Sequence, residues 1–187
     1  MTDALARLLA IAPAPSEPLQ KDWGDVERRL GVRLPADYKE LIQVCGGSNW
    51  DDYLYVLEPD CPNKHYDLIT WASHQTEDLE DLWEVEKKPA ELEAEGTQVV
   101  LWATTDNGEC LYWLVRPGLE PDRWTVMVNE ARGDRWEHFP VSCTQFLASA
   151  LDGELKSGIL SSLFPPRRTR VPQASRDLTC LVVADGR

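Results

Sequence analysis

The stretch Val99–Val115, VVLWATTDNGECLYWLV, decides the fold class of this chain, because two apolar runs flank a short polar corner. Side chains alternate along the first run between two faces, as they do in a half-buried strand. The corner, Asp-Asn-Gly at 106–108, contains the residue types that tolerate a tight hairpin turn. The stretch therefore predicts two antiparallel strands joined by this turn.

Further strands are predicted on both sides of this hairpin. The run RWTVMVNEA, residues 123–131, alternates in the same way, and WEHF, residues 136–139, adds a short fourth strand. Upstream, residues 53–57 are β-prone and bounded by Asp and Pro. Near the C-terminus, DLTCLVV at 177–183 has the composition of an edge strand or an arm. Together these runs predict a meander-like central antiparallel sheet.

Segments with helical periodicity precede and follow the predicted strands in the chain, and one lies between them. Apolar residues recur at helical spacing in 3–11, 23–30, 35–45 and 70–87, and a last helix follows Ser142, which has capping-box spacing with Gln145. The fold class is therefore α+β, with helices packed at the N- and C-terminal ends of the sheet. We expect a single domain over 1–155, with an added N-terminal helix, and a basic, Pro-containing tail over 156–187.

Charge is distributed unevenly along the chain. The formal net charge is −13 at pH 7, and residues 1–160 hold 14 Lys and Arg against 30 Asp and Glu. Such a body repels nucleic acid phosphates and anionic membranes, and it attracts basic proteins over long range. The alternative interpretation is that the charge only confers solubility.

Cysteine usage and hydropathy indicate a cytoplasmic protein. No signal peptide and no apolar run of membrane-spanning length is visible. The five cysteines are odd in number and form no CxxC pair, which favours reduced thiols over disulfides or a zinc site. They are Cys45, Cys61, Cys110, Cys143 and Cys180.

Catalytic chemistry finds little support in the sequence. Cys110 follows Glu109, whose charge raises the pKa of a neighbouring thiol, and Cys45 lies at a helix C-terminus, where the dipole disfavours a thiolate. None of the three histidines has a second ligand at metal-binding spacing. Phosphate-binding and nucleophile-elbow motifs are absent. We predict no catalytic residue, no metal and no cofactor, and an enzyme is the weakest of the hypotheses.

Two acidic segments are candidates for binding a partner. Residues 77–95 hold nine carboxylates against two Lys on a predicted helix and the segment after it, whose default interpretation is a solvated face. The second segment follows Gly-Gly-Ser-Asn and places Trp50 in an acidic loop. There the Trp50 ring either anchors an interface with a partner or packs within the domain. The predicted partner-binding residues are Trp50, Asp51, Asp52, Tyr53, Glu77, Asp78 and Asp81.

Three ordered blocks resemble one known family. The layout W…LG…LP.DY..LI…GG from Trp23 to Gly47, then TTDNGECLYWLV, then NEARGDRWEHF before a final helix, resembles the SUKH superfamily. That superfamily groups relatives of yeast cell-wall-synthesis regulators with many bacterial immunity proteins. The resemblance covers roughly Leu19 to Leu155. It implies an α+β fold without a catalytic centre.

The resemblance also implies a function. Bacterial members often neutralise toxins, commonly nucleases, by binding the toxin domain, and fungal members act as regulatory scaffolds. We therefore expect a non-catalytic immunity protein that binds a basic toxin domain. The alternative is a regulatory or scaffold module with no toxin partner.

Overall fold

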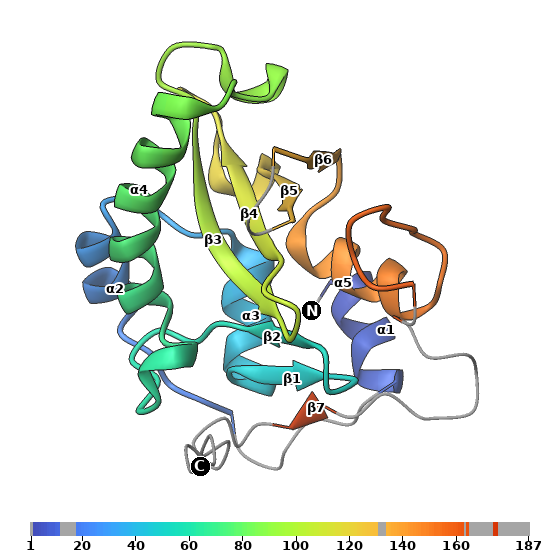
Figure 1. Ribbon diagram of the computed structural model, residues 1–187. Helices are drawn as coiled ribbons and strands as arrows, with labels where there is room; N and C mark the ends of the chain where they lie inside the picture. The colour runs from blue at the N-terminus through green and yellow to red at the C-terminus, as the bar shows by residue number, and fades with distance from the viewer. Residues whose placement is uncertain (1, 12–17, 131–133, 163, 165–173, 176–187) are drawn as a thin grey trace, which may run out of the picture.

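A seven-stranded antiparallel sheet forms the centre of the part of the chain that the structure describes, in the order β6-β5-β4-β3-β2-β1-β7 (Figure 1). The computed structural model describes residues 2–11, 18–130, 134–162, 164 and 174–175. Strands β1 to β6 are adjacent in chain order, which confirms the predicted meander. The strands are β1 (Ser48–Trp50), β2 (Leu54–Val56), β3 (Gln98–Thr105), β4 (Cys110–Val115), β5 (Thr125–Asn129), β6 (Trp136–Phe139) and β7 (Ala174–Ser175).

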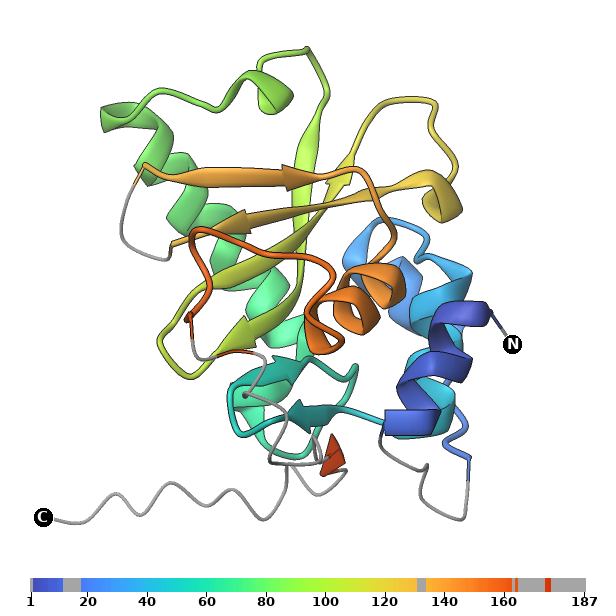
Figure 2. The ribbon, with the colours of Figure 1, turned by 90° about the vertical axis from the view of Figure 1, so that its right-hand side faces the viewer.

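Helices cover both faces of this sheet. α4 lies along one face, whereas α1, α3 and α5 lie together along the other (Figures 1 and 2). α1 to α3 precede the first strand and α5 follows β6, so the α+β fold class is confirmed. The helices are α1 (Asp3–Ile11), α2 (Trp23–Leu30), α3 (Ala36–Cys45), α4 (Leu68–Val85) and α5 (Cys143–Leu151), with short 3-10 helices η1 (Lys64–Tyr66), η2 (Ala90–Leu92) and η3 (Pro121–Arg123).

Local signals in the sequence set the ends of the helices. α2 ends at Gly31, whose φ of 71° is left-handed and suits glycine. α5 begins with the predicted capping box between Ser142 and Gln145. Pro35 is the residue immediately before α3 and not part of its first turn. The end of α2 and the start of α5 agree with the sequence because they depend on neighbours within a few residues, whereas α4 begins and ends two residues earlier than the expected 70–87.

The β3–β4 hairpin forms as predicted, with one irregularity. Gly108 at its corner has a φ of 94°, which glycine adopts without strain. A bulge between residues 101 and 103 inserts Trp102 as an extra residue in β3. The Trp102 ring then lies 6.2 Å from the Trp113 ring, stacked with it in the core. The bulge therefore supplies a second large ring to the core.

Three segments differ from the expected strands. β1 was not predicted, and the expected strand over 53–57 is the shorter β2. β1 pairs with β7 through Asn49 and Ser175, so a short C-terminal strand does join the sheet. The edge strand predicted at 177–183 lies outside the described residues. Short strands depend on partners distant in the chain, which explains why β1 and β7 escaped prediction.

Tyr38 in α3 links the helical layer to the sheet. The ring is fully buried and lies 4.8 Å from the Trp113 ring, edge to face, and 6.3 Å from the Trp23 ring. Its hydroxyl donates a hydrogen bond of 2.5 Å to the Leu57 carbonyl oxygen. A buried tyrosine needs such a partner, because an unpaired hydroxyl in the core is costly. The LP.DY block thus builds the core.

Asp37, one residue earlier, joins α3 to α5. Its Oδ2 accepts hydrogen bonds from the backbone N–H (3.2 Å) and the hydroxyl (2.8 Å) of Thr144, in the first turn of α5. The first N–H groups of a helix lack partners within the helix, so a carboxylate there is stabilising. This contact spans more than one hundred residues and orients the two helices against each other.

Glu27 holds the connection between α2 and α3. Its Oε1 accepts a hydrogen bond of 2.8 Å from the Leu34 N–H and forms an ion pair with Lys39. Burial by itself raises the pKa of the Glu27 carboxyl, but the bonds from Lys39 and Leu34 outweigh burial and hold that pKa below its usual value. The charged form of Glu27 therefore stabilises the fold.

Glu27 should make stability depend on acidity. Because its pKa is lower in the folded state, its stabilisation is complete above the unfolded-state pKa of about 4.3 and is lost as the pH falls through the folded-state pKa. We expect Glu27→Gln to cost about 1 kcal/mol at neutral pH and less at about pH 3. Urea unfolding at both pH values measures this difference. The control Glu120→Gln, at an exposed ion pair with Arg33, should change little at either pH. A Glu27→Gln cost that is equal at both pH values would contradict the assignment.

The segment after α5 folds back onto the end of the hairpin. Leu160 and Phe164 are buried, and the Phe164 ring lies 5.0 Å from the Tyr53 ring. The Ser161 N–H donates a bond of 2.8 Å to the Tyr53 hydroxyl, which itself donates to Glu109 Oε2 at 3.2 Å. Part of the predicted tail therefore packs on the domain. The division at residue 155 stays a prediction, and the Arg-rich part of the tail at 165–173 lies outside the described residues.

Candidate protein-binding surface

The groups with catalytic potential are dispersed or buried. Among the described residues, no three His, Cys, Asp or Glu side chains are placed to hold a metal ion. Cys45 and Cys110 are buried, as expected, and burial raises the pKa of the Cys110 thiol, with the Glu109 charge adding to the effect. Cys180 lies outside the described residues. Within the described residues, none of the helices combines the length and apolar character of a membrane span.

Trp50 does not lie in a loop, so that expectation is wrong. It is the last residue of β1, its side chain is 0% exposed, and its indole N–H donates a bond of 2.8 Å to Ser48 Oγ. The side chain points into the core because Trp50 pairs with Leu54 across the β1–β2 hairpin, on the buried face. Trp50 is therefore a core residue and presents no surface to a partner.

The turn after Trp50 gives Asp51 and Asp52 a conformational role. Both have left-handed φ values, 60° and 52°, and the Tyr53 N–H closes the turn onto the Trp50 carbonyl oxygen at 3.3 Å. Asp is one of the few residues other than Gly that adopts this conformation readily. Asp52 is exposed and accepts a bond of 3.3 Å from the Asn49 amide, and Asp51 is half-buried. The left-handed turn therefore explains the two Asp residues without any protein partner.

Tyr53 is buried as well. Its exposed fraction is 8%, and its hydroxyl belongs to a polar cluster with Glu109 and Ser161. Thr105 also donates to Glu109, and the Asn107 amide reaches the other carboxylate oxygen at 3.3 Å. Glu109 is 8% exposed, so this cluster closes the end of the hairpin instead of facing a ligand. Of the four predicted residues in this segment, Asp52 is the one most open to solvent.

α4 presents the acidic face that the sequence predicted. Asp78 and Asp81 are exposed, as are Glu80 and Glu84 between and after them. The opposite side of the helix is apolar, with Leu79 buried against the sheet. The helical position of Glu77 is described, but its side chain lies outside the described residues. The predicted acidic face is therefore present on the surface.

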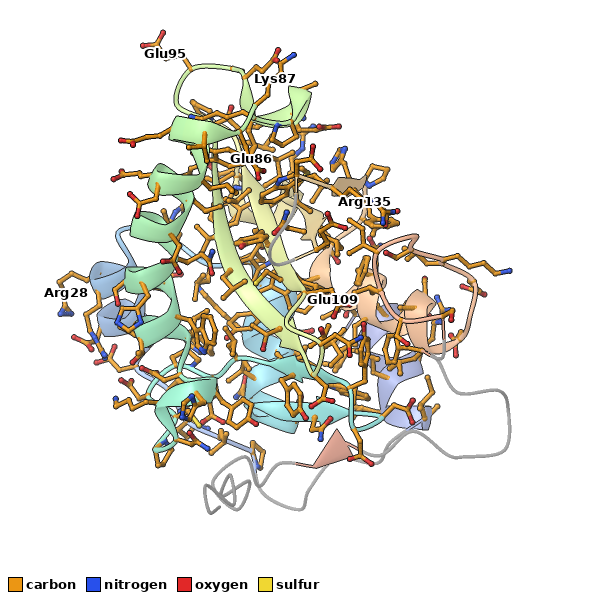
Figure 3. The ribbon with its side chains drawn as sticks, in the orientation of Figure 1. Arg28, Glu86, Lys87, Glu95, Glu109 and Arg135 are labelled. Carbon is orange, nitrogen blue, oxygen red and sulfur yellow. The ribbon has the colours of Figure 1, made fainter. Side chains whose placement is uncertain are left out.

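The segment that follows α4 extends this acidic region. Figure 3 shows Lys87 and Glu95 at the end of the molecule beyond the C-terminal end of α4, whereas Glu86 is half-buried and its Oε2 is covered. Lys87 pairs with Glu93 at 3.4 Å, and both side chains are largely exposed. Such an exposed pair is weak, so the region remains negatively charged. We call the exposed carboxylates of α4 and of residues 86–95 the α4 acidic surface.

The two predicted acidic segments do not form one patch. Figures 1 and 2, which share a vertical axis, place β1 and β2 at the lower end of the molecule and the C-terminal end of α4 at the upper end. The structure therefore separates Asp51 and Asp52 from the α4 acidic surface. A partner of ordinary size contacts both only by spanning much of this side of the protein.

A groove of about 270 Å³ lies beside the α4 acidic surface. Sequence reasoning missed it, because its walls come from three segments that are distant in the chain. The apolar side chains among its walls are half-buried or buried, and Glu80 links them to the acidic surface. The groove is lined by Leu30, Val32, Ala72, Gln75, Leu79, Glu80, Trp83, Lys88, Leu92, Thr97, Gln98, Val99, Val100 and Leu101.

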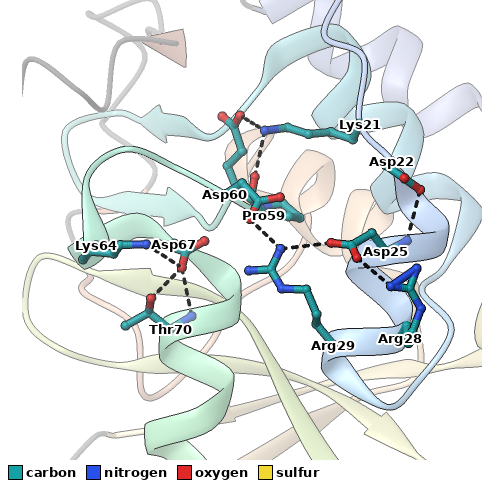
Figure 4. Close-up of polar contacts among 11 residues, drawn as sticks. Lys21, Asp22, Asp25, Arg28, Arg29, Pro59, Asp60, Lys64, Asp67 and Thr70 are labelled. Atoms are coloured by element: carbon teal, nitrogen blue, oxygen red, sulfur yellow. Dashed lines mark hydrogen bonds and ion pairs between the residues drawn. The ribbon is translucent and has the colours of Figure 1, made fainter.

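Ion pairs fix the two helical walls of this groove. Arg29, next to the groove residue Leu30, pairs with Asp60 at 2.7 Å and with Asp25 at 3.3 Å (Figure 4). Asp60 lies in the loop that leads into α4, so the pair holds α2 beside that helix. Lys21 pairs with Glu58 of the same loop, and both side chains are only 13% exposed. α2 and the segment before it are thus joined to the loop that leads into α4.

An exposed apolar residue marks the end of the same region. Val85, the last residue of α4, is 83% exposed, the one large hydrophobic side chain so open among the described residues. Trp83, two residues earlier, lines the groove, with the Lys88 ammonium 5.7 Å from its ring centre. Because residues two apart lie on opposite sides of a helix, Val85 is on the solvent side of α4 and Trp83 is on the groove side.

The comparison with known families agrees with this architecture. The family SUKH_6, described as SMI1-KNR4 cell-wall, matches residues 20–147, which run from just before α2 into α5. No curated protein and no solved structure matches the chain. The match covers well over half of the 187 residues and includes the LP.DY block, the central hairpin and α4. The chain therefore belongs to the SMI1-KNR4 cell-wall family, SUKH_6, within the SUKH superfamily.

Proposed function

We propose that this chain is a cytoplasmic immunity protein that binds and neutralises a basic toxin domain, with a nuclease domain as the best-matched target. Family membership supports a protein-binding role in general, because immunity proteins are frequent among SUKH domains. The family is generally non-catalytic, so the protein acts by occupying a surface of its partner. The observation that carries the proposal is the α4 acidic surface.

Electrostatics selects the class of partner. The net charge of −13 and the exposed carboxylates of α4 repel phosphates of nucleic acid and lipid. A nuclease domain must itself attract phosphate and is therefore basic around its active site. A negative surface that is complementary to the nuclease active site speeds association with the nuclease, and the same surface covers that active site in the complex.

Asp78 and Asp81, with Glu77 beside them on α4, are the proposed contacts. The side chains of Asp78 and Asp81 are exposed on α4 and need no rearrangement before binding. Asp52 is a second candidate contact, at the other end of the molecule. Trp50 and Tyr53 are not included, because both side chains are buried in the described structure.

Charge reversal on α4 tests the proposal. The partner is first isolated by co-purification with the full-length protein from the native host and identified by mass spectrometry. We expect Asp78→Lys combined with Asp81→Lys to weaken binding of that partner about 100-fold at low salt and less at about 0.15 M salt, where charges are screened. Surface plasmon resonance at both salt concentrations measures the change.

The control variant carries the same change in net charge on another side of the molecule. Asp3→Lys combined with Glu154→Lys lies near α1, on the opposite face of the sheet from α4, and should retain nearly full affinity. If both double variants weaken binding equally, the charge effect is general and the α4 contact is wrong. If the partner keeps its full activity when bound, the protein is a regulatory or scaffold module and not an immunity protein.

A further inference from the structure

One edge of β3 is open where it borders the groove. Gln98 to Leu101 pair with β4 on one side, whereas β2 pairs only with Ala103 to Thr105 on the other side. Among the described residues, no backbone hydrogen bond joins residues 98–101 to a segment other than β4. An open strand edge presents unpaired N–H and C=O groups, which is a template for a further strand.

Apolar walls flank this open edge. The groove is lined by Leu79 and Trp83 from α4, by Leu92 from η2, and by Leu30 and Val32 from the end of α2 and the residues after it. Successive side chains of an added strand point to opposite faces, so alternate residues of an incoming segment would meet these apolar walls. The edge and the walls together form a receptor for an extended peptide.

We propose that this groove binds an extended segment of the protein partner, which adds as a strand to the edge of β3 at residues 98–101. The proposal rests on the proposed function in that the partner is a basic protein. Strand addition to a sheet edge is a recurring mode of peptide recognition, in which backbone bonds give affinity and side-chain pockets give specificity. The groove thus supplies the specific contact beside the long-range attraction of the acidic surface.

Charge defines the sequence of the incoming segment. Glu80 is the one carboxylate among the lining residues and Lys88 the one cation, whereas Asp81 lies on the other side of α4 from Leu79 and Trp83. A segment that alternates apolar residues with Lys or Arg therefore matches the apolar walls, pairs with Glu80 and is attracted by the net charge of −13. A helical segment has no free backbone groups along its length for the β3 edge, so an extended segment fits better.

Matched peptide probes test strand addition on the full-length protein. The first probe is the hexapeptide Val-Lys-Val-Lys-Val-Lys with blocked ends. The second has the same sequence but carries N-methyl groups on alternate residues. The backbone N–H groups along one edge of this peptide are thereby removed, so that edge cannot donate hydrogen bonds. The third replaces each Lys by Glu. Binding is followed by NMR titration of backbone amides and by their hydrogen exchange.

The first probe should shift the amide signals of residues 98–101 and slow their exchange. N-methylation should weaken binding about tenfold or more, since it removes backbone bonds and keeps the side chains. The Glu probe should not bind. Equal binding of the first two probes, shifts confined to another surface, or no binding of the first probe would each overturn strand addition at β3.

A groove-filling variant separates this inference from the proposed function. Gln75→Trp fills the groove from α4, and His74→Trp places the same ring on the exposed side as a control. We expect Gln75→Trp alone to abolish binding of the first probe and to weaken the native partner. If it leaves the partner's affinity unchanged, the groove assignment is wrong and the immunity function stands. If the probe binds as expected but the native partner is not a toxin, the groove stands and the immunity function is wrong.

Discussion

Replacing Tyr38 by alanine is expected to lower the free energy of unfolding by about 3–5 kcal/mol, the largest effect of any substitution considered in this protein. Its ring is fully buried and packs edge to face on Trp113, and it also contacts Trp23 of α2. Removing the ring opens a cavity between the helical layer and the sheet, which the surrounding side chains fill only in part. Urea unfolding at neutral pH, followed by tryptophan fluorescence, measures the loss.

A second variant separates the contribution of the Tyr38 hydroxyl to stability from that of the ring. Tyr38→Phe keeps the ring but leaves the Leu57 carbonyl oxygen without its donor, and it should cost about 1–3 kcal/mol. Burial raises the pKa of the Tyr38 hydroxyl well above its usual value, so the hydroxyl remains a donor throughout the measurable pH range. As a control, Tyr66→Phe alters a half-buried ring and should cost clearly less. A Tyr38→Phe variant as stable as the parent would show that the Leu57 bond contributes nothing.

Replacing Asp37 by alanine is expected to cost about 2–3 kcal/mol, the second largest effect, because one carboxylate serves two donors of Thr144 at the start of α5. Loss of these bonds leaves a half-buried helix terminus unpaired and frees α5 from α3. Asp37→Asn should recover part of the loss, since its amide oxygen still accepts a bond. Thermal and urea unfolding measure both variants.

An exposed carboxylate in a comparable role provides the control for Asp37. Asp122 accepts a bond of 2.7 Å from the Ala36 N–H at the start of α3, at an exposed position. Asp122→Ala should cost about 0.5–1 kcal/mol, as for an ordinary helix cap. If the two alanine variants lose the same free energy of unfolding, the contact between α3 and α5 stabilises the protein no more than an ordinary helix cap. The assignment for Asp37 is then wrong.

Part of the candidate surface was accessible to sequence reasoning. The acidic face of α4 follows from the spacing of carboxylates and apolar residues within one helix, and Asp78 and Asp81 are exposed as expected. The predicted family was correct, because the blocks that carry the resemblance build the core and the hairpin. Such features depend on residues close together in the chain or on an ordered set of motifs.

Trp50 shows where local reasoning failed. A Trp after Gly-Gly-Ser-Asn and before two Asp residues has the composition of a loop anchor. The structure buries it because β1 pairs with β2, and because the left-handed turn at Asp51 and Asp52 returns the chain at once. The same turn explains the two Asp residues without a partner. Pairing between strands decided the environment of this side chain, and a three-residue strand carries too weak a pattern to reveal it.

The α+β class, the glycine end of α2, the capping box of α5, the central hairpin, the acidic face of α4 and the family all follow from the sequence, whereas α4 begins and ends two residues earlier than expected. These follow from periodicity, turn chemistry and charge, which act over a few residues. Three features depend on the folded structure: the burial of Trp50 and Tyr53, the cap that Asp37 provides to a helix more than one hundred residues away, and the open edge of β3 beside an apolar groove. These depend on which distant segments meet, because burial and open edges arise from packing between elements and not from the composition of any one of them.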